Sequence, residues 1–289
     1  EFHQVDCCDL ENMTKAMEGC DIVYHTAATA YEGLSVFSPV LVTRNIFEAS
    51  VTTITAAIRN KVKRIVYCSS MARYGHHDQV PYKEDYECRP QDPYGIAKKA
   101  GEDVLRNLCE THGVEYVIAV PHNIVGPRQK YDDPFRNVMS IMLNRMLQGK
   151  QPIIYGDGKQ QRCFSYIDDC LYCLNALAFQ DNVVGEIINI GPDEEPITIN
   201  ELAEACANET GINLDPIHHK DRPKEVKLAV CSSDKARELL GYSTATNLRQ
   251  SVKKTAEYIR SRGTKKFQYH LPLEIINDKT PETWKNKLI

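Results

Sequence analysis

The sequence contains no glycine-rich turn of the form G-x-G-x-x-G or G-x-x-G-x-x-G, although it has 15 glycines. Such a turn follows the first strand of a dinucleotide-binding α/β domain, where it approaches the cofactor phosphates. The chain starts instead at a segment typical of the third strand of such a domain. Two interpretations follow: either the first βαβ part of a dinucleotide-binding domain lies outside this chain, or the fold binds no dinucleotide.

Long apolar runs and long basic blocks are also missing. Without a long apolar run, no transmembrane segment is expected. The formal net charge is −4, so nucleic acid is not an expected partner. The hydrophobic share of 42% is sufficient for the core of a soluble globular protein.

The 11 cysteines are scattered and odd in number, and no signal peptide is recognisable. This usage favours a reducing, cytoplasmic location. Cys170 and Cys173 have the C-x-x-C spacing, but they lie in an apolar helical segment, where core packing is the favoured interpretation. The adjacent Cys7 and Cys8 and the paired histidines have no companion ligands at zinc spacing, so we predict no metal site.

The first two thirds of the chain alternate short β-rich runs with helical patterns, which is typical of an α/β fold with a parallel sheet. Strands are predicted at Asp21–Ala28, Lys63–Ser70 and Glu115–Gly126 and in the segment GEIINIG, and helices at about Val40–Asn60, Tyr94–Glu110, Pro134–Gln148 and Asp168–Phe179. After about residue 195, short helical patterns separated by loops predict a small C-terminal lobe. The final stretch has no clear period and is expected to pack along the surface.

The segment RPQDPYGIAKKAGEDVL places Tyr94 and Lys98 four residues apart on one face of a predicted helix. Asp92 is a suitable N-cap for this helix, and a proline follows it at the first helical position. Ser70 ends a predicted core strand, and the carboxyl ends of parallel strands form the ligand crevice of such folds. We therefore expect the three side chains to converge.

The spacing alone decides nothing, because a second Tyr-x-x-x-Lys occurs at Tyr155 and Lys159. That pair brackets the turn sequence GDG, where no helix aligns the two side chains. For Tyr94, a nearby ammonium and a positively charged nicotinamide would favour the phenolate and lower a pKa that is otherwise near 10. The phenolate could then remove a proton from a sugar hydroxyl, with Ser70 orienting the same oxygen.

Several segments in chain order resemble the extended short-chain dehydrogenase/reductase family, and most closely its nucleotide-sugar 4-epimerases. They are YCSSMARYG, PYGIAKK, PHNIVGPRQ, YGDGKQQRCFSYIDD and RPKEVKLAVCSSDKARELLGY. The resemblance implies a Rossmann-like, doubly wound parallel sheet that binds NAD. It also implies that the glycine turn falls before Glu1, and hence an N-terminally incomplete NAD-binding domain over residues 1–150. Residues 151–195 would belong partly to it, and residues 196–289 mainly to a substrate-binding lobe.

The resemblance also assigns roles to single residues. Ser70, Tyr94 and Lys98 match the family's catalytic residues. The positions that match cofactor-contacting residues are Asp6, Cys7, Ala27, Ala28, Thr29, Asn45, Tyr94, Lys98 and Pro121. The positions that match substrate-contacting residues are Ser70, Met71, Asn123, Arg162, Arg222 and Ala229. Two fixed arginines suit the diphosphate of a UDP-sugar. A homodimer through a helix bundle, formed by the helices near 40–60 and 94–110, is a further implication of the family.

The residues after Ser70 bear on the type of reaction. Dehydratases and decarboxylases of the family usually carry an acidic residue there, whereas this chain has Met71 and Ala72. This favours epimerisation at C4 through a transient keto-sugar. Ala229 stands where a bulky tyrosine restricts some relatives to unsubstituted hexoses, so an N-acetyl group is expected to fit. A nucleotide-sugar dehydratase or reductase, and a non-catalytic nucleotide-sugar binder, remain as alternatives.

One position departs from the family pattern. Pro121 stands where many relatives carry a larger residue, often tyrosine, beside the nicotinamide; proline fixes the backbone φ and removes a donor. The adjacent His122 is interpreted as a packed loop residue.

Overall fold

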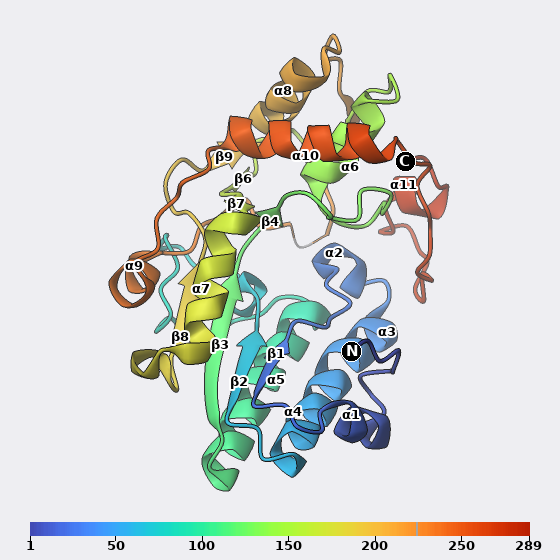
Figure 1. Ribbon diagram of the computed structural model, residues 1–289. Helices are drawn as coiled ribbons and strands as arrows, with labels where there is room; N and C mark the ends of the chain where they lie inside the picture. Colours follow the sequence, from blue (N-terminus) through green and yellow to red (C-terminus); the bar gives the residue numbers. More distant parts are fainter. Residues whose placement is uncertain (224) are drawn as a thin grey trace.

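The computed structural model describes residues 1–223 and 225–289, and its centre is a four-stranded parallel sheet (Figure 1). The strand order is β1-β2-β3-β8, with bounds β1 Ile22–His25, β2 Arg64–Cys68, β3 Glu115–Pro121 and β8 Ile187–Ile190. Each neighbouring pair is parallel. Parallel strands need covering on both faces, which explains why these segments are mostly apolar.

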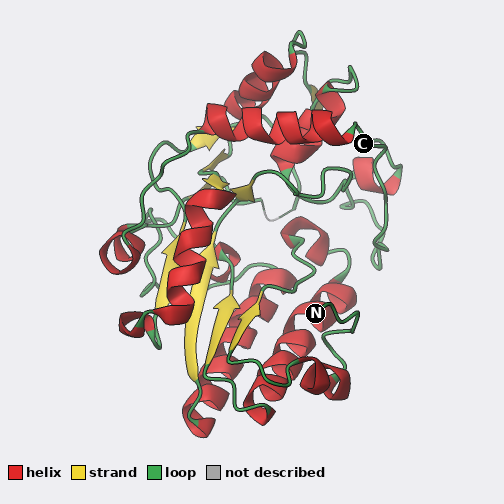
Figure 2. Ribbon diagram, viewed as in Figure 1, coloured by secondary structure: helices red, strands yellow, loops and turns green. Residues whose placement is uncertain are grey.

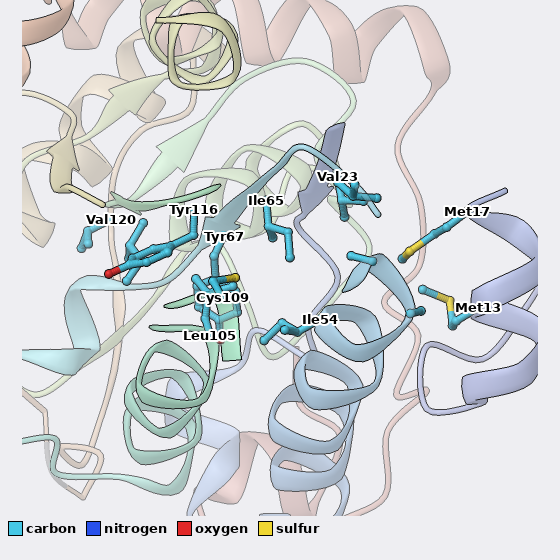
Figure 3. Packing of buried hydrophobic residues seen from close by; sticks show 14 of the residues in the cluster. Met13, Met17, Val23, Ile54, Ile65, Tyr67, Leu105, Cys109, Tyr116 and Val120 are labelled. Carbon is cyan, nitrogen blue, oxygen red and sulfur yellow. The ribbon is translucent and has the colours of Figure 1, made fainter. Parts of the chain in front are cut away.

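Helices cover both faces of the sheet (Figure 2). On one face, α4 (Ala49–Arg59) and α5 (Pro93–His112) pack against alternate strand residues such as Ile65 and Ile118. Figure 3 shows this cluster, in which Ile54 of α4 and Leu105 of α5 approach the strands. α1 (Leu10–Ala16) packs beside α4.

The opposite face is covered by α7 (Ile167–Phe179). Val66, Val117 and Ala119 of the strands face α7, whose Cys170 and Cys173 are fully buried among them. The core-packing interpretation of these two cysteines is thus confirmed. Eleven cysteines are free in the structure.

The second layer of the molecule lies beyond the carboxyl ends of the strands and is mostly helical (Figure 1). α6 (Val138–Met146), α8 (Ile199–Thr210) and α10 (Leu248–Arg262) share one apolar cluster. Short strands connect this layer: β4 Ile124–Val125 with β7 Ser165–Tyr166, β5 Ile153–Tyr155 with β10 Ile217–His219, and β6 Gln161–Arg162 between β9 Ile197–Thr198 and β11 Leu228–Ala229. α9 (Asp234–Leu240) packs against β8 and α7.

The α/β, Rossmann-like fold class predicted from the sequence is confirmed by this parallel sheet and its helices. The helix predicted at Val40–Asn60 consists of α3 (Pro39–Thr43), a π-helical turn over Arg44–Glu48 and α4. α1 and the short α2 (Glu32–Ser35) were not predicted. The division at residues 150 and 195 stays a prediction.

The end of the chain differs from the expected surface packing. Residues 264–289, which we call the C-terminal strap, leave α10, descend to the level of α2 and return to α11 (Glu282–Lys285) (Figure 1). Trp284 of α11 is only 2% exposed and packs with Leu34, Phe37 and Phe135. The strap therefore contributes to a core, which a search for periodicity cannot detect because α11 is a single turn.

No helix in the described part of the chain is long and apolar enough to cross a membrane.

Candidate active site

A cavity of about 650 Å³ lies at the carboxyl ends of β1, β2 and β3, beneath the helical layer. It brings together ten of the residues predicted from the sequence: Ala28, Ser70, Met71, Tyr94, Lys98, Pro121, Asn123, Arg162, Arg222 and Ala229. The remaining five, Asp6, Cys7, Ala27, Thr29 and Asn45, are not among its lining residues. The position agrees with the general rule for ligand crevices in parallel sheets.

Local sequence explains how the three predicted catalytic residues reach this cavity. Ser70 follows β2, and its hydroxyl accepts a hydrogen bond from the Ala72 amide at 3.2 Å, which starts the 3₁₀ turn Met71–Arg73. Asp92 caps α5 by accepting from the Gly95 amide at 2.9 Å. Tyr94 therefore lies in the first turn of α5, and Lys98 follows one turn later on the same face.

Burial governs the titration of this pair. It raises the pKa of Tyr94 to about 12, although the Ser70 hydroxyl and the Arg136 guanidinium oppose the rise. It lowers the pKa of Lys98 to about 8, against the opposing influence of Cys68 and of the Glu102 carboxylate. In the protein alone the Tyr94 pKa is thus raised and not lowered, because lost hydration disfavours the phenolate more than the neighbouring groups stabilise it.

Lys98 is poorly supplied with acceptors. Its ammonium donates to the Cys68 carbonyl at 2.7 Å and lies 5.4 Å from the centre of the Tyr67 ring, while the side chain is 3% exposed. An ammonium carries three donors, and the described residues offer it this one hydrogen-bond acceptor. A ligand with hydroxyl oxygens at this place would fit the remaining donors.

Sequence reasoning did not identify the buried polar residues behind Ser70. Glu102, one turn after Lys98 on α5, accepts from the Ser69 hydroxyl and lies 2.9 Å from the Arg73 guanidinium. Glu102 and Arg73 are 1% and 3% exposed. The Tyr94-x-x-x-Lys98-x-x-x-Glu102 spacing is the signal that could have identified it, since all three share one helix face.

The two predicted arginines meet at one carboxylate. Arg162, at the end of β6, lies 3.1 Å from Glu225, and Arg222 lies 2.6 Å from the other oxygen of the same carboxylate. The Arg222 guanidinium also stacks 5.0 Å from the centre of the Tyr155 ring. All four side chains line the cavity. The sequence alone did not identify Glu225 or Tyr155 as parts of this group.

Lys159, the second member of the other Tyr-x-x-x-Lys pair, is exposed and does not line the cavity. Tyr155 ends a strand, so no helix aligns it with Lys159, as expected.

Glu32, the first residue of α2, adds an acidic group that sequence reasoning missed. Its carboxylate is accessible through the cavity yet enclosed by protein, and this desolvation raises its pKa to about 7. Asp92 and Glu225 raise it further, whereas Arg162 and Arg222 lower it. The cavity therefore holds a carboxyl group that titrates near neutral pH. This group comes from α2, since the residues directly after Ser70 are apolar.

The loop after β1 supplies small residues. Ala28 and Ala30 line the cavity and pack near Tyr94 and Val42. The Thr29 hydroxyl accepts a hydrogen bond from the side-chain amide of Asn45 at 2.9 Å, which ties the loop to the π-helical turn. Nearer the chain start, the carboxylate of Asp6 lies 3.1 Å from the guanidinium of Arg44. The hydrogen bond from the backbone N–H of Cys8 and this guanidinium hold the pKa of Asp6 below its usual range.

These features are compatible with NAD. The methyl side chains of Ala28 and Ala30 leave room along the sheet edge, and the buried Lys98 has donors to spare for ribose hydroxyls. Ala27 is exposed on the same loop, and Cys7 is half-buried beside Asp6. Ala28, Ala30 and Lys98 therefore fit the cofactor that the sequence predicted, and the contacts of Asp6, Cys7 and Ala27 with it stay predictions.

The cavity wall between β3 and β4 is formed by Pro121, His122 and Asn123. Pro121 ends β3. Asn123 adopts a positive φ of 44° and donates to the Cys163 carbonyl at 2.9 Å. His122 is 1% exposed and pairs through Nε2 with the Pro192 carbonyl at 2.9 Å, so it is the packed loop residue that was predicted. Ala229, in β11, pairs in register with Arg162.

The fold and the site define a class. Residues 1–191 match the model of the NAD-dependent epimerase/dehydratase family, and the chain belongs to this family. It is an enzyme of an NAD-dependent family, in agreement with the cofactor predicted from the sequence.

Individual relatives narrow the comparison. The chain is 31% identical over 265 residues to a putative UDP-glucose 4-epimerase of Methanocaldococcus jannaschii, covering 90% of this chain and 84% of that protein. It is also 31% identical over 277 residues to the GDP-mannose 3,5-epimerase of Arabidopsis thaliana, covering 91% and 71%. The solved UDP-glucose 4-epimerase of Thermotoga maritima with UDP-glucose superimposes with a TM-score of 0.85 at 28% identity, covering 90% and 84%.

Proposed function

We propose that this enzyme inverts C4 of a UDP-hexose or UDP-N-acetylhexosamine through a transient 4-keto sugar. The observation that carries the proposal is the convergence of Ser70, Tyr94 and Lys98 with Arg162 and Arg222 on one cavity. The first three suit proton transfer at a sugar hydroxyl, and the two arginines suit a diphosphate. The 4-epimerases among the similar proteins agree with this reaction.

The roles of the residues follow from their positions. NAD, when bound, supplies the nicotinamide that takes up and returns the C4 hydrogen with its electron pair. Tyr94 accepts the proton of the C4 hydroxyl, and Ser70 holds the same oxygen in place. Lys98 binds the ribose and favours the Tyr94 phenolate by its charge. Because the protein alone raises the pKa of Tyr94, the phenolate depends on positive charge brought by the ligands.

The remaining predicted contacts belong to the same proposal. Asp6 and Cys7 would contact adenine, Ala27–Thr29 and Asn45 the cofactor phosphates and ribose, and Pro121 the nicotinamide. Met71, Asn123 and Ala229 would contact the sugar nucleotide. A homodimer through the α3–α4 and α5 helices, and a cytoplasmic location, stay predictions.

The test is conversion of UDP-GlcNAc in D₂O by the purified protein with added NAD, followed by NMR. We expect the C4 epimer without deuterium at C3 or C5, because the C4 hydrogen is returned and no other carbon loses a proton. Tyr94→Phe should reduce the rate by about 10²-fold or more. Unaltered activity of Tyr94→Phe would refute the assignment, and net NADH formation would support a dehydrogenase.

Glu32 supports one alternative reaction. A carboxyl with a pKa near 7 in the same cavity can take or give a proton at a ring carbon, as a dehydratase or a 3,5-epimerase requires. Deuterium at C3 or C5 of the product would favour that reaction over C4 epimerisation. A non-catalytic binder has no use for the Ser70, Tyr94 and Lys98 set, and it would show no turnover of any sugar nucleotide tested.

A further inference from the structure

The C-terminal strap connects the two walls of the active-site cavity. On the sheet side, Glu274 accepts hydrogen bonds from the Val40 and Leu41 amides, both at 2.9 Å, and the Pro272 carbonyl accepts from the Ser38 hydroxyl at 2.6 Å. These contacts fasten the strap to α3. Further along the strap, Trp284 of α11 lines the cavity.

On the other side, the strap reaches the arginine that faces the diphosphate position. Thr283 of α11 forms a hydrogen bond with the Tyr155 hydroxyl. The Tyr155 ring lies under the Arg222 guanidinium, with 5.0 Å between the ring centre and the central guanidinium carbon Cζ. Thr283 is 1% exposed. The path from strap to guanidinium therefore has two contacts, one polar and one cation–π.

Trp284 closes the same wall. It lines the cavity, and its ring packs edge-to-face with Phe37 and Phe135 at centroid distances of 6.1 and 5.5 Å. A Cβ added to Gly33 of α2 would lie 3.3 Å from the Arg222 guanidinium and 3.4 Å from the Trp284 ring. α2, Arg222 and Trp284 thus fit tightly together, so a shift of α11 itself would be transmitted to Arg222.

We propose that the C-terminal strap is a substrate-positioning element, in which Thr283, through Tyr155, fixes the Arg222 guanidinium for the diphosphate of the nucleotide sugar. The proposal rests on the proposed function for the identity of the ligand. Thr283 and Trp284 act through Arg222 and are positioning residues. Their effect falls on the binding of the nucleotide part of the substrate and leaves the chemistry at C4 unchanged.

The test is titration of the full chain with UDP by calorimetry, which needs neither NAD nor turnover. Thr283→Val keeps the shape of the side chain and removes the hydroxyl, so the Kd for UDP should rise about fivefold, the value of one hydrogen bond. Thr283→Ser restores the hydroxyl and should bind as the unmodified protein does. With UDP-GlcNAc as substrate, Thr283→Val should raise KM by a similar factor and leave kcat unchanged.

Tyr155→Phe provides a second route, because it removes the same bond and keeps the ring beneath Arg222. It should raise the Kd to the same extent as Thr283→Val, and the double variant should be no worse than either. Ser38→Ala loosens the strap at its other anchor and serves as the control for general loosening. It should lower the unfolding midpoint without this loss of affinity.

The outcomes separate the two proposals. If the unmodified protein binds UDP and both Thr283→Val and Tyr155→Phe bind it equally well, the strap proposal is overturned and the proposed function stands. If the unmodified protein does not bind UDP, the proposed function fails, and the strap proposal fails with it. A fall in kcat at constant KM would also overturn the positioning role.

Discussion

The carboxylate of Glu102 lies 2.9 Å from the guanidinium of Arg73, and both side chains are almost completely buried behind Ser70. Removing one partner of a buried ion pair leaves the other charge without compensation. We therefore expect Glu102→Gln to lower the free energy of unfolding by about 3 kcal/mol, as measured by urea denaturation. Because Glu102 also accepts from the Ser69 hydroxyl, kcat should fall as well.

The matched control is Glu110→Gln, at the exposed end of the same helix. It changes the same functional group without breaking a buried pair, and should alter the free energy of unfolding by no more than about 0.5 kcal/mol. Equal stability of Glu102→Gln and Glu110→Gln would contradict the structural role assigned to the buried pair.

We expect the buried ammonium of Lys98 to lower the free energy of unfolding. Its pKa of about 8 in the folded protein lies below the ordinary value of 10.5, because burial disfavours the ammonium. The unfolded chain therefore binds more protons between these values, and the free energy of unfolding should rise as the pH increases from about 8 to 10.5. Lys98→Met should remove this pH dependence and stabilise the protein at pH 7 by ~1–3 kcal/mol.

The same variant should lose activity, because Lys98 is assigned to cofactor binding and to the charge that favours the Tyr94 phenolate. Urea denaturation at a series of pH values checks the stability, and the D₂O assay checks the activity. A Lys98→Met protein that is less stable than the unmodified protein at pH 7 would show that the bond to the Cys68 carbonyl outweighs the cost of burial.

Glu32 predicts a pH dependence of substrate affinity. Desolvation by the surrounding cavity walls raises its pKa to about 7, although the side chain is accessible through the cavity, so its carboxylate forms as the pH rises through that value. The carboxylate would face a bound diphosphate across the arginines Arg162 and Arg222, and like charges repel. Calorimetric affinity for UDP-glucose, whose diphosphate does not titrate between pH 6 and 8, should therefore weaken across this range. The Glu32→Gln variant should bind UDP-glucose with equal affinity at both ends of this pH range.

The groups that face Glu32 are Asp92, Glu225, Arg162, Arg222 and Tyr94. The pH dependence of affinity in Asp92→Asn provides the comparison, because Asp92 is a second carboxylate of the same cavity but serves as the N-cap of α5. A pH dependence that persists in Glu32→Gln would assign the effect to another of these groups.

Local patterns were sufficient to predict the α/β class, the α5 helix and the convergence of Ser70, Tyr94 and Lys98. α5 carries its start and end signals in sequence, namely Asp92 as N-cap and Gly113 at φ 68° as C-cap. The strands are mostly apolar because both faces of the sheet are covered. These signals are local, and so they can be recognised without the tertiary structure.

The missed residues act through contacts between distant segments. Thr283 meets Tyr155 across 128 positions, and Glu225 meets Arg162 across 63. Glu32 lies in a four-residue helix that has no apolar period of its own. The raised pKa of Tyr94 likewise follows from its burial by segments that are distant in the sequence. No local pattern specifies such neighbours, so sequence reasoning could identify α5 and its cavity-facing residues but not their surroundings.

Ala229 provides the sharpest prediction about the substrate. It is 6% exposed, pairs in register with Arg162 and lines the cavity. If its methyl group leaves room for a 2-N-acetyl substituent, Ala229→Tyr should fill that space. We expect kcat/KM for UDP-GlcNAc to fall by about tenfold or more, while that for UDP-glucose changes little. Coupled assays with the two substrates measure the ratio directly.

Ala229→Ser controls for the disturbance of β11, because it adds one polar atom without filling the space. It should retain the substrate preference of the unmodified enzyme. If Ala229→Tyr folds with an unchanged unfolding midpoint and still converts UDP-GlcNAc at the original rate, residue 229 does not control access of the N-acetyl group. The preference would then have to arise elsewhere on the cavity wall, which also includes Met71, Tyr82 and Gln160.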